Sequence, residues 1–290
     1  MTFETLLLPA EVQALLKTAT RHETPCGAGS MVWHSWGQAT RNPVHAPVVL
    51  LHGGSGSWTH WLRNIAALVD SGRWILAPDL PGFGDSAAPV TGNDADALPE
   101  IVEYGLRRLL GSTSCDMVGF SFGGMVAGLL AKHFPGRVAR LVLVGAPGLG
   151  IDPDKAIRLR AWRHLAEPGQ QDDRHRSNLA TLMLLHAESN MALALSVHKA
   201  NVLRDRMQGR SLSRTDVLAR TLAQVQCPMY AIYGSADALY AGRMQALEAV
   251  LRRGPTFKRL SLIESAGHWV QFERADAFNA ALQAVLSSDR

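Results

Sequence analysis

Short apolar runs alternate with amphipathic stretches along most of the chain. Within each run the apolar residues are consecutive, which indicates strands covered on both faces, as the strands of a parallel sheet are. The alternation predicts βαβ units and therefore an α/β fold, with a mostly parallel sheet flanked by helices. The predicted strands cover residues 48–52, 74–78, 115–120, 141–145, 229–234 and 259–263, and a strand near 31–36 precedes them. The predicted helices cover about 10–19, 58–69, 99–110, 122–133, 241–253 and 275–286.

Residues 151–222 interrupt this alternation, because they favour helix, are rich in arginine and contain no convincing strand. We expect them to form a helical cap, or lid, inserted into a core made of residues 1–150 and 223–290. A cap over the carboxyl ends of the strands would enclose the place where open parallel sheets bind ligands.

Composition supports one large core, since 47% of the 290 residues are apolar and 19% are charged. The net charge of +4 lies in one segment: residues 151–225 hold 12 Lys and Arg against 8 Asp and Glu, and the remainder holds 17 of each. Without a basic run or a basic patch interleaved with aromatic residues, nucleic-acid binding is not expected.

Three widely spaced cysteines, Cys26, Cys115 and Cys227, form neither a disulfide framework nor a CxxC metal site. The first residues carry an acid where a signal peptide needs a base, and no apolar run approaches the roughly 18 residues that a bilayer span requires. We therefore expect a cytoplasmic protein that acts on a small molecule without a membrane partner, and the sequence leaves a homo-oligomer open.

The segment 119–124, Gly-Phe-Ser-Phe-Gly-Gly, is the strongest chemical motif. It has the form G-x-S-x-G and lies between a predicted strand and a predicted helix, which is the context that a nucleophile elbow requires. The turn is so tight that side chains at Gly119 and Gly123 would collide, and it leaves the Ser121 hydroxyl exposed above the sheet. Ser121 is the predicted nucleophile.

A serine hydroxyl needs a base, and the base needs an acid that fixes its tautomer. Of the eleven histidines, His268 lies in a turn just after the last predicted strand. The acid should lie between the serine and the histidine in chain order, at the carboxyl end of a strand. Asp237 meets both conditions, which completes a predicted triad of Ser121, Asp237 and His268.

Acyl chemistry also needs hydrogen-bond donors for an oxyanion. The first predicted donor is the backbone N–H of Phe122, which follows the nucleophile. The second is the N–H of Gly54 in the loop 52–56, where glycines let the backbone approach a ligand closely. Gly53, Ser55 and Phe120 lie beside these groups and are predicted to contact substrate, whereas His52 is predicted to hold the loop together.

Residues 82–87 fit the dinucleotide motif G-x-G-x-x-A, but two prolines precede them and no helix is predicted to follow. The sequence also contains no Walker-type loop and no His and Cys cluster with the spacing of a metal site. No cofactor and no metal is therefore predicted.

Together these segments resemble the α/β-hydrolase superfamily over about residues 45–150 and 225–290. Within it, residues 51–54, 145–150 and 267–273 look like the meta-cleavage-product hydrolases, which cut a carbon–carbon bond in 2-hydroxy-6-oxo-dienoates. In that family the residue at the position of Trp269 lines the substrate pocket. Two features depart from its pattern: Phe120 replaces the usual asparagine before the serine, and no single cap arginine aligns with the one that binds the substrate carboxylate.

The expected activity is thus that of a serine hydrolase on a small carbonyl substrate, with a carboxylic ester expected first. Carbon–carbon hydrolysis of a dienoate and a non-catalytic small-molecule-binding protein are the alternatives. An anionic substrate would need a cap cation, although we expect most cap arginines to be solvated. The candidates are Arg158, Arg160, Arg163, Arg204 and Arg206.

Overall fold

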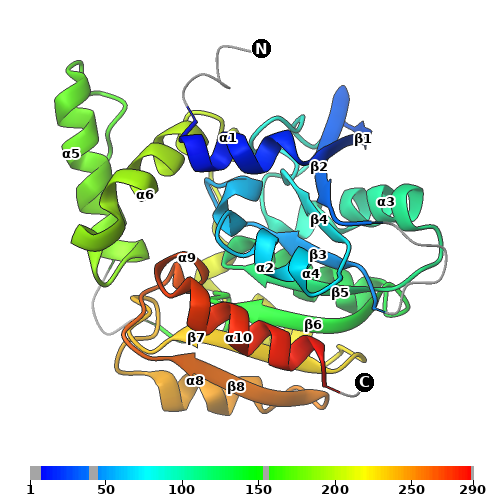
Figure 1. The fold of residues 1–290 in the computed structure, drawn as a ribbon. Coiled ribbons are helices and arrows are strands. Elements are labelled where there is room, and N and C mark those ends of the chain that lie inside the picture. Colours follow the sequence, from blue (N-terminus) through cyan, green and yellow to red (C-terminus); the bar gives the residue numbers. More distant parts are fainter. Residues whose placement is uncertain (1–7, 39–44, 153–156, 289–290) are drawn as a thin grey trace.

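In the part of the chain that the structure describes, eight strands form one sheet through the middle of the molecule (Figure 1). The structure is a computed structural model that describes residues 8–38, 45–152 and 157–288. The strands are β1 (Thr20–Cys26), β2 (Gly29–Trp36), β3 (Val48–Leu51), β4 (Ile75–Pro78), β5 (Cys115–Phe120), β6 (Val138–Val144), β7 (Met229–Gly234) and β8 (Phe257–Ile263). Their order is β1-β2-β4-β3-β5-β6-β7-β8, in which β1 and β2 pair in antiparallel fashion and the strands from β4 to β8 are parallel.

Helices cover both faces of this sheet, as the continuously apolar strands predicted. Alternate residues of β3 enter different cores: Val49 and Leu51 belong to one apolar cluster, and Val48 and Leu50 to the other. The first cluster includes residues of α3 (Pro99–Leu110), α4 (Phe122–His133) and α8 (Met244–Leu251). The second includes residues of α1 (Ala10–Lys17), α2 (Ile65–Asp70) and α10 (Ala275–Leu286).

The observed elements confirm most of the predicted ones, and the bounds of β5, β7, α3, α4 and α10 agree with the sequence to the residue. The predicted helix over 58–69 is divided into a 3-10 turn (Trp58–Trp61) and α2. Strand β1 was not predicted, because it is an edge strand with mostly exposed positions and contains Pro25, so it lacks the apolar run of a buried strand.

Within residues 151–222, the described part holds α5 (Pro168–Asn178), a π-helical turn (Leu179–Met183), α6 (Ala187–Val202) and α7 (Val217–Leu222), and no strand. Helices α5 and α6 stand to one side of the sheet (Figure 1). Helix α7 instead packs on the core helix α4, where Leu218 occupies the space that a Cβ atom at Gly128 would need. The boundaries 151 and 222 of the cap stay a prediction.

In the described ranges no single helix is long and apolar enough to cross a membrane. Two consecutive helical segments, Pro168–Met183 and Ala187–Val202, reach that length and apolar composition only when they are joined. The angle of the bend between them is 116°.

A buried ion cluster ties the last helix to the sheet. Asp116 on β5 lies 3.3 Å from the guanidinium groups of both Arg73 and Arg140. The two arginines also donate to the carbonyl of Leu286, at distances of 2.7 and 2.9 Å. Removing one partner of such a cluster leaves uncompensated charge in the interior, which is far more costly than losing an exposed pair.

We therefore expect Asp116→Ala to lower the free energy of unfolding by about 3–5 kcal/mol. The matched control is Asp173→Ala, which breaks an exposed pair with Arg176 and should change it by less than about 0.5 kcal/mol. Urea denaturation of both variants measures the difference, and equal losses would contradict a structural role for the buried cluster.

Candidate active site

Ser121 stands at a tight turn between β5 and α4. Its backbone has a φ of 49° and a ψ of −116°, a conformation that residues other than glycine rarely adopt. A Cβ atom at Gly119 would lie 2.4 Å from the carbonyl oxygen of Gly123, and one at Gly123 would lie 2.4 Å from that of His52. Both glycines are therefore required by the close packing of strand, turn and helix, as the sequence predicted.

The structure brings together the three residues of the predicted triad. His268 Nε2 lies 3.0 Å from Ser121 Oγ, and His268 Nδ1 lies 2.9 and 3.0 Å from the two carboxylate oxygens of Asp237. A proton on Nδ1 therefore donates to the carboxylate, which leaves Nε2 free to accept the proton of the serine. Asp237 and His268 are buried, so the carboxylate acts on the imidazole without competition from solvent.

The loops that carry the acid and the base are packed against each other. A Cβ atom at Gly234 would lie 2.2 Å from the carbonyl oxygen of Gly267, so the last residue of β7 packs directly against the loop after β8. Ala236 N–H also donates to the carbonyl of Ala266 over 3.0 Å. Because both strands end at the same edge of the sheet, residues far apart in sequence are held at hydrogen-bond distance.

The predicted oxyanion donors lie side by side next to the nucleophile. A Cβ atom at Gly54 would stand 3.7 Å from the Cβ of Phe122, which places the two backbone segments in contact. Phe122 is the first residue of α4, where backbone N–H groups have no partner within the helix. In the described part of the chain, neither the Phe122 N–H nor the Gly54 N–H donates to another group.

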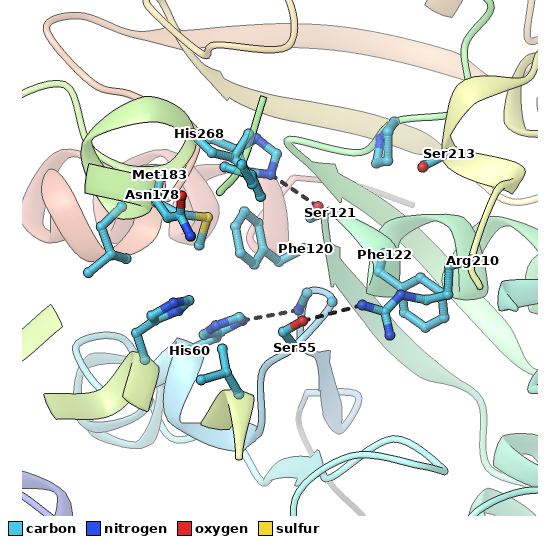
Figure 2. Close-up of a pocket in the computed structure, with 18 of the residues that line it drawn as sticks. Ser55, His60, Phe120, Ser121, Phe122, Asn178, Met183, Arg210, Ser213 and His268 are labelled. Atoms are coloured by element: carbon cyan, nitrogen blue, oxygen red, sulfur yellow. Dashed lines mark hydrogen bonds between the residues drawn. The ribbon is translucent and has the colours of Figure 1, made fainter. Parts of the chain in front are cut away.

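These groups open into a cavity of about 620 Å³ (Figure 2). The predicted contact residues Gly53, Ser55 and Phe120 line it together with Ser121 and His268. Residues of the predicted cap form other parts of the wall: Arg160, Asn178, Leu179, Leu182, Met183, His198, Val202, Arg210, Ser213 and Arg214.

Trp269 does not lie among the lining residues, although the family resemblance placed it there. Its indole is buried, stacks on Phe272 at 4.1 Å and donates from Nε1 to the carbonyl of His60 over 3.1 Å. The ring of His60, 4.9 Å away, belongs to the cavity wall. The structure thus places Trp269 one layer behind His60, and sequence reasoning missed His60.

Arg210 is a second lining residue that the sequence did not single out. Its guanidinium lies between Ser55 and Phe122 (Figure 2), 5.1 Å from the ring of Phe83 and 5.6 Å from that of Phe122. Both terminal nitrogens donate to Asp205 over 3.0 Å, and Asp205 also accepts from Ser55 Oγ over 2.5 Å. The charge of Arg210 therefore already has a partner.

The five predicted cap candidates lie in different places. Arg160 lines the cavity. Arg163 donates to the carbonyl of Val202, Arg204 pairs with Asp85, and Arg206 donates to the carbonyls of Gly84 and Ser86, so these three hold segments together. Arg158 is exposed and is not part of the wall.

The segment 82–87 that fits a dinucleotide motif forms turns without a following helix. Asp79 beside it is buried and accepts the N–H groups of Trp58 and Asp85 over 2.9 and 2.8 Å. These bonds give Asp79 a structural role. Among the described residues, no three His, Cys, Asp or Glu side chains are grouped as a metal ion would need.

Residues 46–220 match the family model described as the alpha/beta hydrolase fold, so the chain belongs to that family and is an α/β-hydrolase enzyme. Among its curated relatives are two enzymes named 2-hydroxy-6-oxo-6-phenylhexa-2,4-dienoate hydrolase. The one from Comamonas testosteroni is 30% identical over 80% of this chain and 84% of its own length. The one from Burkholderia cepacia is 29% identical over the same shares. The resemblance to meta-cleavage-product hydrolases is thereby confirmed.

Solved structures show the same fold. An esterase from Rhodococcus sp. ECU1013 superposes with a TM-score of 0.73 at 22% identity, over 92% of this chain and 98% of that one. A meta-cleavage product hydrolase from Pseudomonas fluorescens IP01 gives a TM-score of 0.70 at 23% identity, over 90% and 95%. Both activities therefore occur on this fold, and fold alone does not choose between them.

The two buried carboxylates, Asp237 and Asp79, should respond differently to the same substitution. We expect Asp237→Asn to retain stability and lose about 10³–10⁴ in kcat, because the wrong imidazole tautomer would face Ser121. Asp79→Asn should mainly lower stability, since an NH2 group would replace one carboxylate oxygen and this donor would face a backbone N–H, which is also a donor. Steady-state kinetics and thermal denaturation separate the two effects, and an essential Asp79 with a dispensable Asp237 would reverse the assignment.

Proposed function

We propose that this α/β-hydrolase is a serine hydrolase of carboxylic esters, with Ser121 as nucleophile, His268 as base and Asp237 as the acid that orients it. The observation that carries the proposal is the unbroken hydrogen-bonded series from Ser121 Oγ through the His268 ring to Asp237, at distances of 3.0 and 2.9 Å. Its end at Ser121 lies in the wall of an open cavity.

Ser121 Oγ attacks the carbonyl carbon of the ester while His268 Nε2 removes its proton. The negative charge that develops on the carbonyl oxygen is met by the N–H groups of Gly54 and Phe122. When the tetrahedral intermediate collapses, His268 returns the proton to the leaving alcohol. Water, deprotonated by His268, then attacks the acyl-enzyme. As this second tetrahedral intermediate collapses, His268 returns the proton to Ser121 Oγ and the carboxylic acid is released.

Two features of the cavity favour an ester. Phe120 offers apolar bulk beside Ser121, where an asparagine would offer polar contacts to a dienoate. A dienoate also carries a carboxylate, whose burial is costly without a paired cation. Arg210 is the guanidinium beside the predicted oxyanion hole, and the bidentate bond to Asp205 already compensates it.

Carbon–carbon hydrolysis of a dienoate is the second candidate function, because the two relatives named 2-hydroxy-6-oxo-6-phenylhexa-2,4-dienoate hydrolase align with 80% of this chain. Arg160 and Arg214 also line the cavity, and either guanidinium would be a cation for the dienoate carboxylate. As cellular location we propose the cytoplasm, since Cys26, Cys115 and Cys227 are all free and buried.

The first test of the proposal is Ser121→Ala with a short 4-nitrophenyl ester. Turnover should fall by at least about 10³-fold, because the variant lacks the nucleophile, while the fold persists. Ser196→Ala, on the exposed face of α6, is the matched control. A folded Ser121→Ala variant with activity within tenfold of the parent would contradict the proposal, and a parent without turnover of any ester would favour a binding protein.

The second test compares substrates. We expect kcat/KM for a short 4-nitrophenyl ester to exceed that for a phenyl-substituted 2-hydroxy-6-oxo-dienoate. Phe120 offers no polar contact to the dienoate, and Arg210, the arginine beside the predicted oxyanion hole, is already paired with Asp205. Both reactions can be followed by absorbance with one preparation of the protein. A dienoate-to-ester ratio well above one would overturn the ester proposal in favour of carbon–carbon hydrolysis.

A further inference from the structure

The peptide groups of Gly53, directly before the proposed oxyanion donor Gly54, are held by two imidazoles. His52 Nδ1 donates to the carbonyl of Gly53 over 2.8 Å, and the N–H of Gly53 donates to His60 Nδ1 over 3.2 Å. On its other side, His52 Nε2 accepts the N–H of Leu80 over 2.8 Å. The loop is thus fastened from both sides, and the bond to His60 lies on the side of the cavity (Figure 2).

These bonds require both imidazoles to be neutral. A nitrogen that accepts a hydrogen bond carries no proton, so the proton of His60 lies on Nε2 and that of His52 lies on Nδ1. Burial lowers the pKa of His60 well below its ordinary value, and it lowers the pKa of His52 in the same direction. His60 therefore remains an acceptor for the Gly53 N–H at neutral pH.

The ring of His60 has little freedom to move. A Cβ atom at Gly56 would stand 2.2 Å from its Cε1, and the ring packs against Phe120 at 5.4 Å. The backbone of His60 is also tied, since its carbonyl accepts from Trp269 Nε1. Trp269 follows the proposed base His268. His60 therefore contacts both the loop of the proposed oxyanion hole and the segment that carries the proposed base.

The loop that His60 holds lies directly on the nucleophile. A Cβ atom at Gly53 would stand 2.9 Å from the Phe120 ring and 3.3 Å from the Cβ of Ser121. An oxyanion donor acts only within hydrogen-bond distance of the developing charge, and a displacement of about 1 Å can cost 10²-fold in rate. The Gly54 N–H shares a peptide group with the Gly53 carbonyl, which His52 holds, and the preceding peptide group carries the Gly53 N–H, which His60 holds. The direction of the Gly54 N–H therefore depends on where both peptide groups are fixed.

We propose that His60 is a positioning residue for the oxyanion hole: its Nδ1 fixes the Gly53 N–H and thereby sets the N–H of Gly54 towards the substrate oxygen. This inference rests on the proposed serine-hydrolase function. It assigns a rate effect to a neutral imidazole that transfers no proton in the reaction.

The decisive comparison is His60→Asn with His60→Leu. The two side chains have nearly the same shape and leave the same void, but Asn retains an acceptor near the place of Nδ1 and Leu does not. We expect His60→Leu to lose about 10²-fold in kcat with KM within threefold of the parent, and His60→Asn to stay within about tenfold of the parent kcat. Binding of a trifluoromethyl ketone, which resembles the tetrahedral intermediate, should weaken in His60→Leu in parallel with kcat/KM.

The control is His34→Leu, because His34 and His60 are both 3% exposed but His34 packs against Trp36 and Trp58 and does not line the cavity. It should lower stability and leave kcat unchanged. If His60→Leu does not fold, His60→Phe, which retains a ring without an acceptor, takes its place.

Equal kcat values for folded His60→Asn and His60→Leu, or a loss that appears only in KM, would overturn the positioning role. Ser121→Ala assayed alongside separates the two claims. If Ser121→Ala is inactive while the two His60 variants are equal, only the role of His60 fails. If Ser121→Ala retains turnover, the proposed function fails and the role of His60 fails with it.

Discussion

The turn at Ser121 is the constraint on which the rest of the site depends. It joins a strand whose six residues are all buried to a helix packed against the same sheet, so neither side can yield to relieve the φ of 49° at the serine. The turn can form only because Gly119 and Gly123 have no Cβ atoms, which would collide with the backbone packed around it. The same turn places Ser121 and Phe122, the first residue of α4, in the wall of the cavity.

Around this turn, the sheet and the predicted cap both hold the site. Three loops from the carboxyl ends of parallel strands supply the residues of the proposed triad. The predicted cap contacts one of these loops and also the loop after β3. Asp205 of the predicted cap accepts from Ser55 Oγ, next to the predicted oxyanion donor Gly54. Glu273 accepts the N–H of Gly267, in the loop of the proposed base, and the N–H of His186 in the predicted cap, at 2.6 Å each. The predicted cap is therefore connected to the loop of the predicted oxyanion donor and to the loop of the proposed base.

The sequence predicted best what depends on local pattern. Buried parallel strands are continuous apolar runs, and an elbow needs glycines at fixed offsets, so β5, α4 and Ser121 followed directly from the residues. Asp237 and His268 followed from chain order and strand ends. Strand β1 escaped prediction because an edge strand needs no apolar run.

His60 and Arg210 could not be predicted, because no motif marks them and only the folded chain shows their contacts. His60 accepts the N–H of Gly53, seven residues earlier, and is one of eleven histidines. Arg210 is one of twelve cations in its segment, and only the folded chain shows that Asp205 compensates it. Trp269 shows the converse: a residue placed on the wall by resemblance lies behind His60 in the folded chain.

The most direct measurement of the central claim is covalent labelling with a fluorophosphonate, followed by intact-mass analysis and peptide mapping. The probe reacts with a serine that an adjacent base activates. The account predicts one adduct per chain, located on Ser121, and its loss when His268 is replaced by alanine. An unlabelled protein, or an adduct on any residue other than Ser121, would contradict it.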